Sequence, residues 1–167
     1  MTLAVPPGGS AGQAQPGAGV RAMLEEDIPE VARLSGQLGY PSTEEQVRRR
    51  FERLARQQDH ETFVAVDERD GVIGWVHVAE QCTIEADPTG EVWGLVVDES
   101  TRNRRIGRRL MAAAEQWARD RGLDVMAVRS NVLRSDAHRF YLSIGYEIAK
   151  SQYKFRKRLA GAEAEPR

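Results

Sequence analysis

The chain has 167 residues, of which 41% are hydrophobic and 29% are charged, and its formal net charge at pH 7 is -1. This length suits one domain with a sizeable core, and the small net charge provides no overall attraction to nucleic acids or anionic membranes. The single cysteine, Cys82, excludes a disulfide framework, and the three scattered histidines do not have the spacing of metal ligands.

Residues 1–19 are mostly Pro, Gly, Ala, Ser and Gln. Such a stretch buries too little apolar area to become ordered, so we expect a flexible tail there. We expect the folded domain over residues 20–159 and a frayed segment over residues 160–167. Because the sequence has neither a bilayer-length apolar run nor the pattern of a signal peptide, it predicts a soluble cytoplasmic protein with no membrane partner.

The first part of the domain has the pattern of a strand followed by two helices. A strand is expected at residues 20–24, and Asp27 can cap a helix that ends at Gly39. A second helix is expected to begin at about Ser42, with Glu45 as its capping-box partner. Its arginine run, residues 48–50, indicates a solvated helix face rather than a nucleic-acid patch.

Strands then alternate with helices in an α/β order. Asp70-Gly71 is a good hairpin turn between two of the strands. The expected strands are residues 62–66, 72–80, 91–97, 123–128, 146–150 and 152–158, and the expected helices are a long amphipathic one from about residue 106 to Gly122 and another at residues 135–144.

The most informative segment is an apolar strand, residues 91–97, that leads through a basic turn directly into a helix. The free amides of a first helical turn and the helix dipole together make an anion site. Five arginines around this turn, at positions 102, 104, 105, 108 and 109, suit a diphosphate, although a solvated helix start is the alternative. The residues match neither a P-loop nor a dinucleotide-binding motif.

This turn resembles a signature of the GNAT superfamily of acyl-CoA-dependent N-acetyltransferases. Arg102-Asn103-Arg104-Arg105-Ile106-Gly107 fits the pattern [Q/R]-x-x-G-x-[G/A], except that Arg105 replaces the first glycine. We therefore expect Arg105 to take helical geometry with its side chain turned aside. Ser130-Asn131, Ala137-His138-Arg139-Phe140-Tyr141 and Gly145-Tyr146 are similar to later elements of the same family. The resemblance spans residues 20–159.

The resemblance implies the fold and the co-substrate. The implied fold is of the α/β (α+β) class: a twisted, mixed, mostly antiparallel sheet of about six to seven strands, with a splayed central pair and about four helices. The implied co-substrate is acetyl-CoA, with no metal. Its implied contacts are Leu95, Val96, Val97, Arg102, Asn103, Arg104, Arg105, Ile106, Gly107, Arg108 and Asn131.

The resemblance also implies the catalytic groups. Tyr141 would be the general acid that protonates the coenzyme A thiolate, and Glu91 would be the base that deprotonates the incoming ammonium. Alternation along a strand would place Glu91 on one face with Trp93, Leu95 and Val97. Glu80, Glu85 and Asp87 are alternative acidic groups.

The expected activity is direct transfer of an acetyl group from acetyl-CoA to an amine in a ternary complex. The acceptor stays open among small amines, such as an aminoglycoside or a polyamine, and peptide amino groups. Trp75, Trp93 and Tyr40 are candidate acceptor contacts. Two alternatives are a catalytically silent acyl-CoA-binding regulator and a nucleic-acid-binding module, the latter disfavoured by the net charge. Pairing as a homodimer is also left open.

Overall fold

The computed structural model describes residues 19–101, 105–157 and 159. They fall into two compact units, which meet in sequence between Arg129 and Ser130. Three residues of the basic turn, Arg102, Asn103 and Arg104, lie outside the described residues, as do almost all of the expected tails. No helix in the described ranges is long and apolar enough to cross a membrane.

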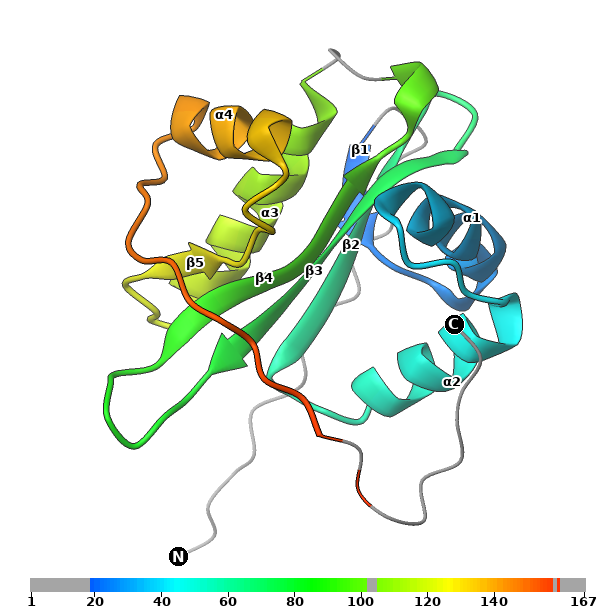
Figure 1. The fold of residues 1–167 in the computed structure, drawn as a ribbon. Helices are drawn as coiled ribbons and strands as arrows, with labels where there is room; N and C mark the ends of the chain where they lie inside the picture. Colours follow the sequence, from blue (N-terminus) through cyan, green and yellow to red (C-terminus); the bar gives the residue numbers. More distant parts are fainter. Residues whose placement is uncertain (1–18, 102–104, 158, 160–167) are drawn as a thin grey trace, which may run out of the picture. The chain divides into compact units, whose positions relative to one another are not determined.

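The first unit contains one five-stranded sheet in the order β1-β2-β3-β4-β5 (Figure 1). Its strands are β1 (Gly19–Ala22), β2 (His60–Val66), β3 (Val72–Gln81), β4 (Thr89–Val97) and β5 (Met126–Val128). The first four are antiparallel neighbours, and β5 pairs in parallel with β4. The β2–β3 hairpin turns at Asp70, whose positive φ of 61° suits the expected Asp70-Gly71 turn.

Helices cover both faces of this sheet (Figure 1). α1 (Ile28–Leu38) lies on one face with α2 (Glu44–Leu54) packed against it, and α3 (Ile106–Asp120) covers the other face as the crossover from β4 to β5. Short 3₁₀ turns, η1 (Glu25–Asp27) and η2 (Glu99–Thr101), precede α1 and α3. Leu110 and Ala114 of α3 are fully buried, because the apolar side chains of this helix recur at the spacing of one helical face.

The starts of the first two helices differ in detail from the sequence prediction. α2 is capped by Thr43, whose hydroxyl accepts from the Gln46 amide, and the Gln46 side chain accepts from the Thr43 amide. The predicted capping box of Ser42 and Glu45 is therefore wrong by one residue, because the same S/T-x-x-E/Q pattern also fits one position later. Asp27 stands at the start of α1, but its carboxylate pairs with Arg21 and accepts from the Leu24 amide.

The second unit contains α4 (Ser135–Ser143), and Gly145, with a φ of 98°, follows its end. The predicted strands at residues 146–150 and 152–158 are wrong within the described residues, where no strand follows α4. Alternating apolar residues are not sufficient for a strand, because each strand also needs a hydrogen-bonded neighbour. Tyr153 and Phe155 are accordingly 91% and 92% exposed. The sheet has five described strands instead of six to seven.

Candidate functional site

The middle of the sheet opens because β4 and β5 pair over a short stretch only. β5 pairs with Gly90, Glu91 and Val92 of β4, whereas β3 stays paired with β4 as far as Val97. From Trp93 to Val97, therefore, one edge of β4 has no neighbouring strand among the described residues. This is the splayed central pair that the resemblance implies.

Two residues of β4 direct their backbone groups to this open edge. The Asp98 amide donates to the Ile73 carbonyl at 2.8 Å, so the backbone of Asp98 faces β3. Backbone direction alternates along an antiparallel strand, which turns the N–H and C=O groups of Leu95 and Val97 away from β3. The backbone of Val96 faces β3, and its side chain lies in the core under α1.

A β-bulge lies at the point where the strands separate. His77 and Val78 of β3 oppose Gly94 and Val92 of β4, which leaves Trp93 as the extra residue. The bulge reverses the alternation, so Glu91 lies on the α1 face, whereas Leu95 and Val97 lie on the α3 face. The prediction that Glu91, Trp93, Leu95 and Val97 share one face is wrong for this reason.

The end of β4 is held to α1 by a group that the sequence analysis did not single out. The Asp98 carboxylate accepts from the amide and hydroxyl of Ser100 at 2.9 and 2.6 Å, and it pairs with Arg33 of α1 at 2.6 Å. These hydrogen bonds and the Arg33 guanidinium lower the pKa of Asp98 to about 2. The spacing Asp-x-Ser suggests such a turn, but the partner Arg33 is 65 positions away and gave no local signal.

The start of α3 has the features of an anion site. The first hydrogen bond within the helix runs from the Arg109 amide to the Arg105 carbonyl, so the helix does not use the preceding amides of its first turn. That turn has no acidic side chain, and no side chain among the described residues caps it. Arg105, Arg108 and Arg109 add positive charge near these amides.

Arg105 does not take the helical geometry that was expected. It precedes α3 with φ 59° and ψ 15°, in the left-handed region that glycine adopts without strain. The family pattern has glycine at this position, and the backbone here explains why. Arg105 keeps the same turn at a cost of about 1 kcal/mol or more in backbone strain.

Glu91 is buried and paired. Only 4% of it is exposed, and its carboxylate accepts from Nη2 of Arg129 at 3.0 Å while Nε of Arg129 forms an ion pair with the other oxygen. The Arg129 guanidinium also lies 5.6 Å from the centre of the Trp93 ring. Glu91 therefore links the end of β5 to the bulge of β4.

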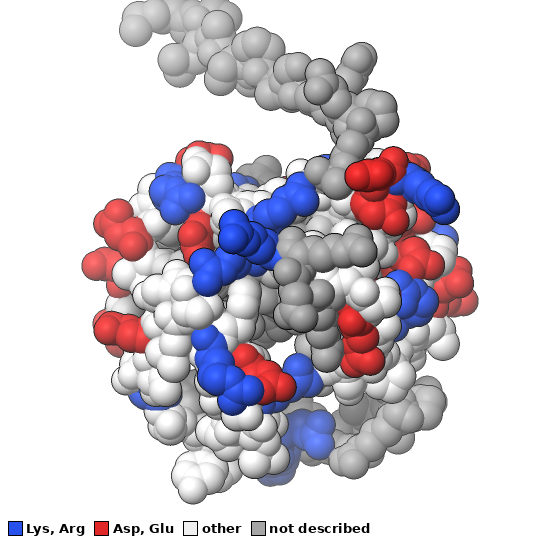
Figure 2. Space-filling view, turned by 90° about the horizontal axis from the view of Figure 1, so that it is seen from above, with Lys and Arg blue, Asp and Glu red and all other residues white. Residues whose placement is uncertain are grey.

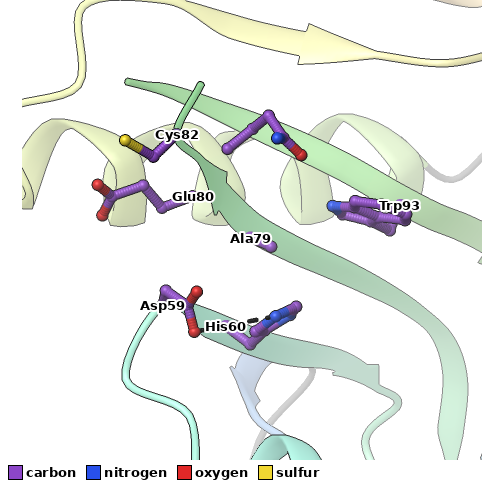
Figure 3. Close-up of a pocket in the computed structure, with 7 residues that line it drawn as sticks. Asp59, His60, Ala79, Glu80, Cys82 and Trp93 are labelled. Atoms are coloured by element: carbon purple, nitrogen blue, oxygen red, sulfur yellow. Dashed lines mark ion pairs between the residues drawn. The ribbon is translucent and has the colours of Figure 1, made fainter. Parts of the chain in front are cut away.

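An open hollow of about 400 Å³ lies beside the bulge. It is lined by Asp59, just before β2, and His60 of β2, by Glu80 of β3 and Cys82 just after it, and by Trp93 of β4 (Figure 3). The other residues that line it are Ala79 and Gln81. The described residues that line it include carboxylates and neither Lys nor Arg, so this surface attracts cations.

Two histidines adjoin this hollow. Nδ1 of His60 and Nε2 of His77 share a hydrogen bond of 3.0 Å, and the rings stack with centres 5.2 Å apart. Burial, together with the charge of His60, lowers the pKa of His77 to about 4. The histidines are scattered in the sequence, and a two-residue turn at Asp70-Gly71 would place His77 opposite Val64. The observed register places His77 opposite Thr62 instead, close to His60. In the described ranges no three His, Cys, Asp or Glu side chains are grouped to hold a metal ion.

The second unit holds two predicted site residues. Tyr141 of α4 packs edge-on against Phe140 and near Tyr146, and burial raises the pKa of its hydroxyl. The side chain of Asn131 accepts from the Leu133 amide at 2.9 Å, so it closes the turn before α4. The backbone carbonyl of Asn131 lies 3.0 Å from Nε2 of His138.

The arginine run of α2 does not form a basic patch. Arg48 pairs with Glu25 and Arg50 donates to the Ser42 hydroxyl. These partners agree with a solvated helix face and give no support to a nucleic-acid-binding module. Elsewhere, on the face seen from above, Figure 2 shows both basic and acidic side chains.

Comparison with known proteins agrees with this geometry. Residues 25–146 match the model of the Acetyltransferase (GNAT) family, a range that includes residues of both units. An aminoalkylphosphonate N-acetyltransferase of Salmonella typhimurium is 38% identical over 89 residues, which are 53% of this chain and 56% of that protein. The chain thus matches little more than half the length of this curated relative.

Solved structures show the same fold. The aminoglycoside acetyltransferase AAC(6')-Iy, in complex with a bisubstrate analogue of CoA and acetylneamine, has a TM-score of 0.74 at 20% identity, over 84% of this chain and 97% of that one. A transcriptional regulator of Bacillus halodurans also has a TM-score of 0.74 at 20% identity, over 84% and 99%. With the family match over most of the chain, the open β4 edge and the α3 anion site, these findings show that the chain belongs to the GNAT family of acetyltransferases.

Proposed function

We propose that this protein transfers an acetyl group from acetyl-CoA to an amine, directly and within a ternary complex. The observation that carries the proposal is the open edge of β4, which leads into an anion site at the start of α3. An extended thioester with a diphosphate at its far end suits an unpaired strand edge followed by a helix N-terminus.

The described residues fit acetyl-CoA in two places. The backbone groups of Leu95 and Val97 are available to hydrogen-bond the pantetheine arm, and the first turn of α3 with Arg105 and Arg108 suits the diphosphate. Arg102, Asn103, Arg104, Ile106 and Gly107 belong to the same turn in the proposal. When bound, acetyl-CoA supplies the activated acetyl thioester.

Tyr141 is the proposed general acid. Its raised pKa keeps the hydroxyl protonated at neutral pH, as a proton donor to a thiolate must be. For Asn131 we propose support of the turn before α4, because its side chain is engaged there, with contact to pantetheine as the role that the resemblance adds.

Glu91 was the base implied by resemblance. Accepting a proton would cost this buried carboxylate its ion pair with Arg129. We therefore propose that Glu91 positions Arg129 beside Trp93. Its role as a base is tested below with the variant Glu91→Gln.

For the acceptor we propose a small polycationic amine such as an aminoglycoside or a polyamine. Asp59 and Glu80 in the hollow favour a ligand with several positive charges. The matched relative is named for aminoalkylphosphonates, whose phosphonate would meet repulsion from these two carboxylates. A panel of polyamines, aminoglycosides, aminoalkylphosphonates and peptides tests the proposal, with free-thiol release and product mass as readouts. Preference for an aminoalkylphosphonate would contradict the proposal that the acceptor is a polycationic amine.

A second candidate function is a catalytically silent acyl-CoA-binding regulator. It is favoured by the structural similarity to a protein described as a transcriptional regulator. It predicts acetyl-CoA binding by calorimetry and no acetyl transfer to any amine of the panel. Changing Tyr141 should then alter neither measurement. Pairing as a homodimer, which either function allows, is measurable by light scattering.

A further inference from the structure

We propose that His60, held by its hydrogen bond to His77, accepts the proton that the acceptor ammonium must lose, and that this ammonium binds in the hollow beside Trp93. This inference rests on the proposed acetyltransferase activity. It assigns the base and the acceptor site, which neither the fold nor the family match provides.

The first step of the argument is the position of His60 in the sheet. His60, Ala79 and Glu91 are direct neighbours across β2, β3 and β4, so all three point to the same face. His60 and Glu91 therefore stand two strand spacings apart, about 10 Å. The small side chain of Ala79 between them leaves room for the hollow.

The second step is the division of roles within the histidine pair. Nδ1 of His60 is engaged by His77, which leaves Nε2 as the ring nitrogen for a ligand, 3.9 Å from a carboxylate oxygen of Asp59. His77, with its pKa of about 4, stays neutral at physiological pH. Within the pair, His77 is therefore the hydrogen-bond partner, and His60 is the residue that lines the hollow. Figure 3 shows His60 and Asp59 on the same side of the hollow.

The third step concerns the surroundings of the pair. The titratable and charged groups that face it are Asp59 at the start of β2, Glu80 and Cys82 at the end of β3, and the Glu91–Arg129 ion pair beyond Ala79. β4 also contributes the half-exposed Trp93 ring, which can stack on a cation. Of the two candidate bases, His60 can accept a proton without breaking an ion pair.

The proton balance is complete. One N–H proton of the ammonium passes to Nε2 of His60, and the neutral nitrogen forms the C–N bond as the C–S bond of the acetyl donor breaks. Tyr141, the proposed donor, gives its proton to the sulfur, and the second N–H proton of the amine restores the Tyr141 hydroxyl. His60 then returns its proton to solvent.

The test compares rate–pH profiles. His60→Asn keeps a hydrogen-bonding group toward His77 but has no base, so we expect kcat/KM for the amine at neutral pH to fall about 100-fold. The defect should shrink as the pH approaches the pKa of the amine itself, and the affinity for acetyl-CoA should not change. His77→Gln keeps a polar group near Nδ1 of His60 and should retain most of kcat/KM. His77→Leu should lower kcat/KM and shift the acidic limb of the profile, which is the range in which kcat/KM falls as the pH is lowered.

Two variants serve as comparisons in the same assay. His138→Asn makes the same replacement at the histidine outside the pair and should keep the acidic limb of the wild type. Glu91→Gln should keep that limb as well. The assignment of His60 would be overturned if the wild-type protein transfers acetyl groups and His60→Asn shows the same fall of kcat/KM at acidic pH as the wild type. It would also be overturned if Glu91→Gln loses that fall. Wild-type protein that transfers to no amine would instead contradict the proposed function.

Discussion

The two units of the molecule differ in how their residues are buried. Every buried hydrophobic side chain of the described residues lies between Met23 and Ala118, in the sheet unit. From Ser130 onward no described residue is buried, although α4 carries the proposed acid Tyr141. The proposed acetyl-CoA contacts of the sheet unit thus rest on a packed core and a backbone edge, whereas the proposed proton donor belongs to a half-buried helix of the second unit. Changes in the two units should therefore have different consequences.

The largest effect should come from Tyr141→Phe in the second unit. Removal of the hydroxyl should lower kcat at least about 100-fold, or about 3 kcal/mol of barrier. Stability should stay within about 0.5 kcal/mol, because the ring and its contacts remain. Steady-state kinetics and urea unfolding measure the two quantities. Tyr153→Phe, at a 91% exposed position in the same unit, should leave both unchanged; equal kinetics in the two variants would remove Tyr141 from the mechanism.

The sheet unit should respond in stability instead, most strongly at Gly94. A Cβ there would lie 2.7 Å from the Trp75 ring, so Gly94→Ala should destabilise the protein by about 2–3 kcal/mol. The matched change is Gly36→Ala in α1, where a Cβ meets nothing within 4 Å. It should stabilise the protein by about 0.5–1 kcal/mol through helix propensity. Similar unfolding midpoints for the two variants would contradict the close packing at the bulge.

A smaller and pH-dependent effect is expected at Asp98. Its pKa of about 2 in the folded state lies below the ordinary value of 3.8, so its contribution is complete above about pH 4 and is lost as the pH falls toward 2. Asp98→Asn should therefore cost about 2 kcal/mol at pH 7. The difference from wild type should close on acidification, as followed by urea unfolding between pH 7 and pH 2. A difference that does not depend on pH would show that the charge of Asp98, held by the Ser100 hydrogen bonds and Arg33, contributes nothing to stability.

The smallest effect is expected at Arg105. Arg105→Gly removes the strain of the left-handed backbone but adds freedom to the unfolded chain. The net result should be a stabilisation of up to about 1 kcal/mol in thermal unfolding. Arg105→Ala should not gain this, because alanine meets the same strain; a gain of equal size in both variants would contradict the strain account.

Local signals predicted much of the sheet unit. Gly39 ends α1, Asp70-Gly71 turns the hairpin, and the spacing of Leu110 and Ala114 gave the buried face of α3. The errors arose where tertiary context decided the outcome. The bulge at Trp93 depends on pairing with β3, and the expected strands after α4 lacked a described partner.

The candidate site likewise combines features that are local in the sequence with contacts between residues that are distant in it. The basic turn before α3 is continuous in sequence and could be predicted, as could the motif around Tyr141. The ion-pair partners of Asp98 and Glu91 could not be predicted, because Arg33 and Arg129 are far from them in the sequence. The histidine pair depends on the observed register of β2 and β3, which a two-residue turn at Asp70-Gly71 would not have produced.

The most direct test of the central claim is calorimetric titration of acetyl-CoA into wild-type protein and Gly107→Asp. An acidic residue in the first turn of α3 favours the helix dipole, so the variant should stay folded. The same charge would repel a diphosphate, and we expect the affinity for acetyl-CoA to fall at least about tenfold. Equal affinities in the two proteins would contradict the diphosphate site at the start of α3, and with it the proposed acetyl transfer.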